Sequence, residues 1–113
     1  MKKPRIESQY IDDILKAISS IFNYTEGLSC EEFLNDRMRA EAVLLNIAII
    51  GESAGKLSKN TQNKYPEIPF AAIISMRNRL IHGYFEVDFY RVWLVVKDDL
   101  PILEEQIKKI VVN

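Results

Sequence analysis

Apolar residues recur at intervals of three and four along most of the chain, which is the spacing of amphipathic helices. The first such segment predicts a helix that ends near Gly27. Its apolar stripe contains Tyr10, Ile11, Ile14, Leu15, Ile18, Ile21 and Phe22. Ser29 and Glu32 then have the spacing of a capping box, which predicts a short helical turn over residues 31–34. Asn35 or Asp36 can cap the helix that follows.

The segment from Arg37 to Lys59 is apolar on more than one side. One line of the predicted helix carries Met38, Ala42, Leu45 and Ile49, and another carries Val43, Ile47, Ile50, Ala54 and Leu57. A helix with this pattern is expected at the centre of a bundle, with neighbours packed on several faces. Gly51 and Gly55, four residues apart, can permit a close approach of another helix.

Two further helices are predicted in the second half of the chain. Residues 60–68 are polar and contain a proline, so we expect them to form a loop that connects the second and third long helices. A third helix is expected from Pro69 to about His82, with Gly83 as its C-terminal stop. Asp88 can cap a last helix, which Pro101 must kink or break. The sequence therefore predicts an all-α, antiparallel four-helix bundle with short extra helical turns, and one domain over residues 1–113.

Composition agrees with a single packed domain. The chain has 113 residues, of which 48% are apolar and 27% charged, so neither disorder nor a membrane protein fits. Glycine and proline together number only eight, which favours long helices over many short strands. We find no signal peptide and no membrane anchor in the pattern.

Charge and cysteine content exclude further classes of protein. The net charge of −1 provides no globally basic surface for duplex DNA. Cys30 is the only cysteine and cannot form an internal disulfide, and with a single histidine it cannot complete a structural zinc site. We therefore expect a protein of the reducing cytoplasm that holds no metal.

One residue breaks the pattern of the third helix. On a helical wheel, Arg77 falls in the middle of an apolar face formed by Phe70, Ile73, Ile74, Leu80 and Ile81. An unpaired buried charge is costly, so this cation must pair with a carboxylate, line a cleft or meet an external anion. A buried ion pair with Glu52 is the structural alternative to a functional site.

The neighbouring polar residues also allow two interpretations. In a continuous helix His82 would project about 140° away from Arg77, so the two side chains meet only if the helix yields. His82 can then exchange protons while Arg77 holds a phosphate, or it can simply be a C-cap residue. Asn78 can orient the imidazole, contact a ligand or face solvent. Tyr84 can be a packing aromatic or expose its hydroxyl beside this pair.

The run SMRNRLIHGYFEVDFYRVW resembles the HepT family of HEPN-domain toxins. The family signature is an arginine, four residues, a histidine, one residue and a tyrosine, here Arg77, His82 and Tyr84. The segment IIGESAGKLS around Glu52 and the DLP sequence in the last helix are also similar to the family pattern. The resemblance covers nearly the whole chain.

This resemblance implies a metal-independent endoribonuclease toxin that needs no cofactor and forms an all-α, HEPN-like homodimer. It implies that Arg77 and His82 are catalytic and that Asn78 occupies a commonly polar position. Tyr84 corresponds to the tyrosine to which a cognate, MntA-like minimal nucleotidyltransferase antitoxin transfers AMP, which neutralises the toxin. We also expect Asn78 and Glu52 to bind or orient the substrate.

The chemistry of RNA fits this implication independently. RNA carries its own nucleophile, the 2′-hydroxyl, so cleavage needs a base, an acid and cationic stabilisation of the phosphorane. One chain supplies one histidine, and a two-fold dimer would supply a second.

Two other functions stay open at this point. The first is a non-catalytic HEPN module that binds nucleotide and partners a nucleotidyltransferase. The second is a structural scaffold in which Arg77 pairs with Glu52 and His82 caps a helix.

Overall fold

A computed structural model describes residues 6–81 and 86–110 of the protein, and within them it contains helices and no strand. The prediction of an all-α fold is therefore confirmed. The helical elements in chain order are α1 (Glu7–Thr25), α2 (Cys30–Leu34), α3 (Arg37–Gly55), α4 (Lys59–Lys64), α5 (Phe70–Leu80), α6 (Phe89–Leu94), the π-helical turn η1 (Val95–Asp99) and α7 (Leu100–Lys108).

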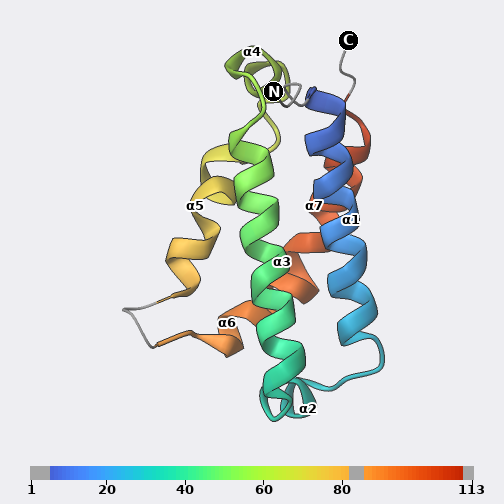
Figure 1. Ribbon diagram of the computed structural model, residues 1–113, viewed down its shortest axis with the longest axis vertical. Helices are drawn as coiled ribbons and strands as arrows, with labels where there is room; N and C mark the ends of the chain where they lie inside the picture. Colours follow the sequence, from blue (N-terminus) through green and yellow to red (C-terminus); the bar gives the residue numbers. More distant parts are fainter. Residues whose placement is uncertain (1–5, 82–85, 111–113) are drawn as a thin grey trace, which may run out of the picture.

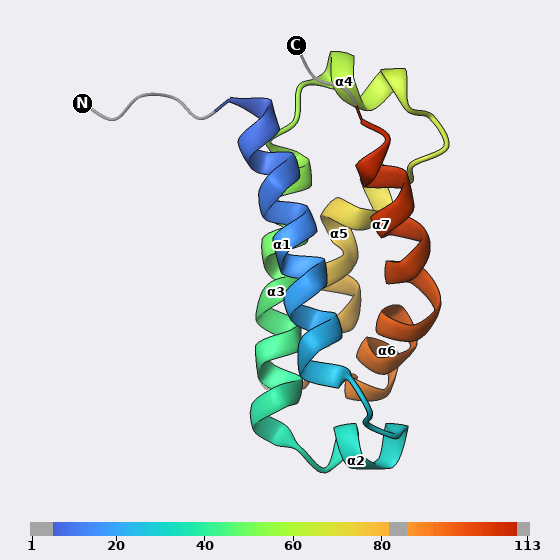
Figure 2. The ribbon, with the colours of Figure 1, turned by 90° about the vertical axis from the view of Figure 1, so that its right-hand side faces the viewer.

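Four long columns make up the bundle: α1, α3, α5, and the continuous run from α6 through η1 to α7. Figures 1 and 2 show α1 and α3 side by side along the long axis of the molecule, with α2 at one end and α4 at the other. None of the described helices is both long and apolar enough to cross a bilayer.

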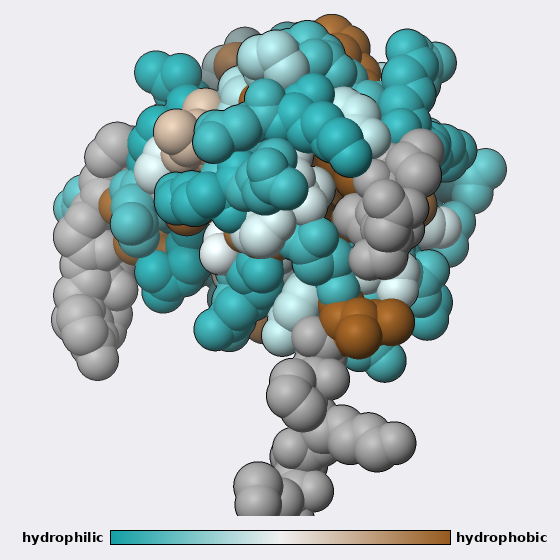
Figure 3. All heavy atoms as spheres, turned by 90° about the horizontal axis from the view of Figure 1, so that it is seen from above, coloured by the Kyte–Doolittle hydropathy of each residue, from teal (hydrophilic) through white to brown (hydrophobic). Residues whose placement is uncertain are grey.

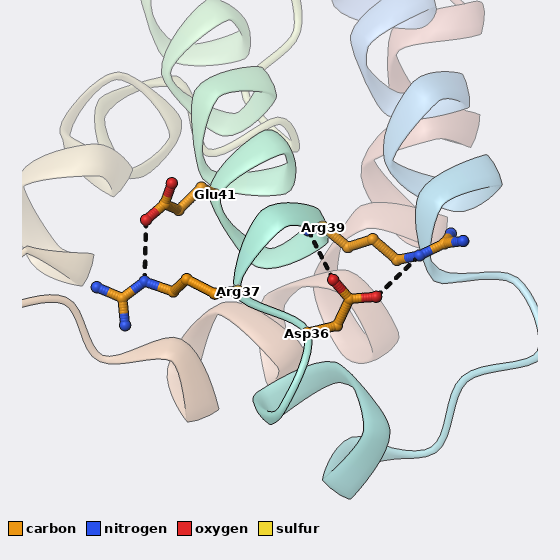
Figure 4. Close-up of polar contacts among 4 residues, drawn as sticks. All are labelled: Asp36, Arg37, Arg39 and Glu41. Carbon is orange, nitrogen blue, oxygen red and sulfur yellow. Dashed lines mark hydrogen bonds and ion pairs between the residues drawn. The ribbon is translucent and has the colours of Figure 1, made fainter.

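The predicted caps at the start of the bundle are confirmed. The Ser29 hydroxyl accepts a hydrogen bond from the Glu32 amide at 3.1 Å, and the Glu32 carboxylate accepts one from the Ser29 amide at 2.9 Å. Asp36 caps α3 by accepting from the Arg39 amide at 3.1 Å. Figure 4 shows this cap together with two exposed ion pairs, Arg37–Glu41 and Arg39–Asp36, which fix side chains but contribute little stability.

The core is formed by the inward stripes of the four columns. Fully buried members include Ile14, Ile18, Ile21, Phe33, Val43, Ile47, Ile50, Val92, Val96, Leu100 and Ile107. The Phe33 ring lies 5.3 Å from that of Trp93, centroid to centroid, which links α2 to α6. Phe33 and Trp93 thus close the end of the bundle opposite α4 (Figure 1).

The expectation that α3 is covered on several faces is only half correct. The line from Val43 to Leu57 is buried, as predicted. The other line is open, because Met38 is 81%, Leu45 62% and Ile49 37% exposed. α1 and α5 pack against α3, but no helix of the described chain covers this last face.

The polar segment predicted as a connection contains a helix, α4. Its sequence KNTQNK has no apolar stripe, so periodicity gave no signal. A local cap and a distant contact stabilise it instead. The side chain of the N-cap residue Ser58 accepts a hydrogen bond from the Thr61 amide, and Glu7 of α1 accepts from both the Ser58 amide and the Thr61 hydroxyl.

Of the two later helices, α5 ends earlier than predicted, and the last one agrees with the prediction. α5 ends at Leu80, before His82, because Ile81 is extended and forms an antiparallel bridge with Val87. The last column is interrupted as predicted: Pro101 lacks the amide that an α-helix would need there, and a π-helical turn precedes α7. Asp88 caps α6 by accepting from the Arg91 amide, as expected.

Candidate functional site

An open groove runs between α3 and α5 and holds about 410 Å³, a volume in the range of small-ligand clefts. Three of the predicted site residues, Glu52, Arg77 and Asn78, line it together. The rest of its lining is Ala48, Gly51, Gly55, Lys56 and Ile74. The structure thus brings the polar residues of two distant sequence segments onto one surface.

Gly51 sets the distance between the two helices that form the groove. A Cβ atom on Gly51 would lie 3.1 Å from the Ile73 carbonyl oxygen and 3.3 Å from that of Ile74. Since these atoms belong to the α5 backbone, a side chain at this position would require the α5 backbone to shift by a few tenths of an ångström. The proposed role for Gly51 in close helix packing is therefore confirmed. Gly55 has room for a side chain, since a Cβ there would meet only the Ile74 side chain, at 3.9 Å.

The helical wheel was wrong to place Arg77 in the middle of the buried face of α5, but the alternative that Arg77 lines a cleft is confirmed. The buried residues are Phe70, Ile73, Met76 and Leu80, while Arg77 is exposed and Ile74 is 39% exposed. Met76 accounts for the difference: at about 100° per residue, its burial moves the centre of the face some 50° away from Arg77. The guanidinium therefore lies at the edge of this face and in the groove.

A buried Arg77–Glu52 ion pair is also excluded. Both residues are exposed, and among the described residues neither takes part in an ion pair. The polar partner of Arg77 is its neighbour Asn78, whose amide oxygen accepts from Nη1 at 3.5 Å. The cation is consequently free to meet an anion from solution, and Asn78 and Glu52 lie beside it.

His82 and Tyr84 lie outside the described residues, so their predicted positions stay predictions. The residues on either side of them form hydrogen bonds with α5. The Ile81 amide donates to the Arg77 carbonyl at 3.2 Å, and the Asp88 amide donates to the Leu80 carbonyl at 2.9 Å. Both ends of the intervening segment are therefore attached to the last turn of α5, the turn that carries Arg77.

Lys56 lines the groove and was not singled out from the sequence. It follows Glu52 by four residues, so the two share a face of α3. This helical spacing was the available signal. It was missed because the predicted helix continued to Lys59. In that prediction Lys56 is an ordinary helical residue, whereas in the structure it caps the C-terminus of α3.

A second groove lies between α5 and α7 and contains none of the predicted site residues. Its floor is apolar, with Ile73, Met76, Leu100 and Leu103. Within residues 6–81 and 86–110, no three side chains of His, Cys, Asp or Glu lie close enough together to hold a metal ion. The α3–α5 groove is thus the described surface on which the predicted residues gather.

Comparison with known proteins gives consistent results. A sequence model of the family described as "Ribonuclease HepT-like" matches residues 14–110. A Thermococcus cleftensis protein named "Probable ribonuclease HepT" is 36% identical over 106 residues, covering 94% of this chain and 96% of its own.

Other relatives agree in name and coverage. A protein of Methanocaldococcus jannaschii whose name proposes an RNase is 37% identical over 102 residues, covering 90% of this chain and 84% of its own. A similarly named protein of Caldanaerobacter subterraneus subsp. tengcongensis is 34% identical over 110 residues, covering 97% and 96%. No solved structure matches the chain. The family match and these relatives together show that the chain belongs to the HepT-like ribonuclease family.

Proposed function

We propose that this protein is the endoribonuclease toxin of a toxin–antitoxin system, and that it cleaves RNA without a metal ion by attack of the 2′-hydroxyl. The observation that carries the proposal is the α3–α5 groove, in which an exposed arginine that has no ion-pair partner among the described residues lies beside Asn78 and Glu52. An exposed guanidinium in a cleft is suited to hold a phosphate through two parallel hydrogen bonds.

In the proposed reaction the 2′-oxygen attacks the adjacent phosphorus and the bond from phosphorus to the 5′-oxygen breaks. A base accepts the 2′-hydroxyl proton, and an acid donates a proton to the leaving 5′-oxygen. Arg77 stabilises the negative charge that builds on the phosphorane oxygens. His82 serves in the proton transfers, while Asn78 and Glu52 orient the arginine and the substrate. The products are a 2′,3′-cyclic phosphate and a 5′-hydroxyl.

A homodimer supplies the second histidine that two proton transfers call for, because each chain contains one. The uncovered face of α3 supports this part of the proposal. Met38, Leu45 and Ile49 lie on one line of the helix, and at about 100° per residue Glu52 and Lys56 continue the same line. A second copy packed on the apolar part, with its α3 running in the same direction, would bring its own groove next to the first.

Tyr84 is the proposed site of inactivation by a nucleotidyltransferase antitoxin. An AMP group there would add a negative charge and bulk two residues from His82 in the sequence. The intact mass of the protein produced with and without its neighbouring nucleotidyltransferase tests this directly. We expect additions of one or more AMP masses, absent in Tyr84→Phe. An unmodified wild-type protein would contradict it.

The enzymatic part is tested by incubating purified protein with RNA in the presence of EDTA. We expect cleavage by the wild type and none by Arg77→Ala or His82→Ala, each of which should still fold as judged by circular dichroism. Intact RNA with the wild type would favour the alternative, a HEPN module that binds nucleotide without cleaving it. Cleavage retained in both variants would reveal a contaminating nuclease.

A further inference from the structure

A second cation lies in the α3–α5 groove. Lys56 caps the C-terminus of α3 and is exposed, and it lines the groove together with Arg77 and Asn78. Glu52 is the groove's carboxylate, one turn before Lys56 on the same face of the helix. Yet no ion pair within the described chain involves either of them. The ammonium group is thus available to an anion that enters the groove.

The sequence segment that begins at Lys56 is basic, although the whole chain is not. Residues 56–64, KLSKNTQNK, contain three lysines and no acidic residue, whereas the whole chain has a net charge of −1. Lys56, Lys59 and Lys64 are all exposed. Figure 3 views the molecule from this end, and hydrophilic residues cover most of it. An anionic chain leaving the groove toward α4 would therefore meet three exposed lysines, and it would pass Glu7 of α1, whose carboxylate accepts hydrogen bonds from Ser58 and Thr61.

Gly55 keeps the groove open between Glu52 and Lys56. It has no side chain, it is exposed, and space is available beyond its Cα, since a Cβ would make only ordinary contact with the Ile74 side chain. The floor beside Lys56 is consequently backbone and the flank of Ile74. An extended polyanion can approach such a surface more closely than a surface lined by long side chains.

We propose that Lys56 binds a backbone phosphate of the RNA next to the scissile one, so that the α3–α5 groove holds two successive phosphates, one at Arg77 and one at Lys56. This inference rests on the proposed function and names the path of its substrate. Lysine suits the role because it binds phosphate as a flexible point charge, without the fixed geometry that an arginine imposes. Lys56 is thus a substrate-binding residue that takes no part in bond cleavage.

Binding and cleavage can be measured separately to test this. A single-stranded RNA carrying 2′-O-methyl groups has no free nucleophile, so fluorescence anisotropy reports its affinity alone. Between about 50 and 200 mM salt, each phosphate contact adds about 0.7 to the slope of log K against log salt. We expect Lys56→Gln to weaken binding about three- to tenfold and to lower that slope by about 0.7. With cleavable RNA, KM should rise while kcat changes little.

Lys108→Gln is the matched control, because it makes the same change of charge at an exposed lysine of α7, a helix that contributes nothing to the groove. It should bind like the wild type. Equal affinities for Lys56→Gln and the wild type would overturn the inference, as would an equal loss in Lys108→Gln. A wild type that binds the methylated RNA but leaves natural RNA intact would contradict the proposed function and not the subsite. Failure to bind RNA at all would overturn both.

Discussion

Arg77 lies in the last turn of α5 with its side chain exposed, and its contribution to stability follows from that exposure. Substitutions of exposed residues without buried partners usually change the free energy of unfolding by less than about 0.5 kcal/mol. A guanidinium that stabilises a phosphorane, by contrast, commonly contributes a factor of about 10² to 10³ to the rate. A structural role and a catalytic role for Arg77 therefore predict opposite results for Arg77→Ala: the first predicts a loss of stability, and the second a loss of cleavage rate.

We expect Arg77→Ala to unfold with a free energy within about 0.5 kcal/mol of the wild type while RNA cleavage falls by about 10²-fold or more. Thermal melts and initial cleavage rates measure the two quantities. A loss of several kcal/mol would contradict this account, because it would mean that the Arg77 side chain makes contacts that stabilise the fold.

Glu7 gives a residue-scale prediction about pH. The pKa of its carboxyl lies below the ordinary value of 4.5, because it accepts a hydrogen bond from the Ser58 amide and another from the Thr61 hydroxyl, at 2.7 Å. A lowered pKa in the folded protein means that the ionised carboxylate stabilises the fold above about pH 4.5. This stabilisation is lost as the pH falls through the folded-state pKa.

Glu7→Gln should therefore lower the free energy of unfolding at pH 7 by about 1 kcal/mol, because it loses the charge on these hydrogen bonds. Urea denaturation at several pH values should show the gap to the wild type narrowing below about pH 4.5. A gap that stays constant from pH 7 into the acid range would show that ionised Glu7 does not hold α4 against α1.

At the scale of elements, the contact between α3 and α5 determines the shape of the groove. Two glycines one turn apart on α3 face α5 under different constraints. Gly51 meets backbone carbonyl oxygens, whereas Gly55 meets a side chain that can move.

Gly51→Ala should destabilise the protein by about 1 to 3 kcal/mol, since its methyl group would force α5 away from α3. Gly55→Ala should leave stability unchanged or raise it by up to about 1 kcal/mol through helix propensity. Chemical denaturation of the two variants in parallel provides the comparison. Equal effects would mean that the helices do not approach each other as closely as the structure shows.

The elements also show where sequence reasoning succeeds and where it stops. Stripes and caps predict the long helices, because a stripe that must be buried and a side chain that caps a helix are both local properties. α4 was missed because its sequence has no apolar stripe and part of its stability comes from Glu7, about fifty residues away. The early end of α5 was missed because Ile81 pairs with Val87, which is a tertiary contact.

The candidate site could also be predicted only in part, because its residues are brought together partly by local spacing and partly by tertiary contacts. Helical spacing placed Glu52 and Arg77 on neighbouring surfaces, and the groove between α3 and α5 brings them together. Spacing alone could not tell whether the surface around Arg77 is buried. The buried face of α5 includes Met76, and this shifts its centre away from Arg77. Predictions for His82 and Tyr84 rest on the resemblance to the family and not on described coordinates.

For the whole molecule, the open face of α3 leads to a prediction about assembly. If a second copy covers Met38, Leu45 and Ile49, then Leu45→Glu should convert the dimer to a monomer and abolish cleavage together. Ile102→Glu is a matched control, because Ile102 on α7 is 60% exposed and Leu45 is 62% exposed. Sedimentation equilibrium and RNA cleavage should both be unaffected by the control. A monomeric wild type, or an active monomeric Leu45→Glu, would contradict the dimer.

The most direct test of the central claim is the chemistry of the RNA ends that the protein produces. With the wild type in EDTA, mass spectrometry of the fragments should find 2′,3′-cyclic phosphates paired with 5′-hydroxyls, and Arg77→Ala should yield neither. Fragments that end in 3′-hydroxyls and 5′-phosphates, or cleavage that requires an added divalent metal ion, would contradict attack by the 2′-hydroxyl in the α3–α5 groove.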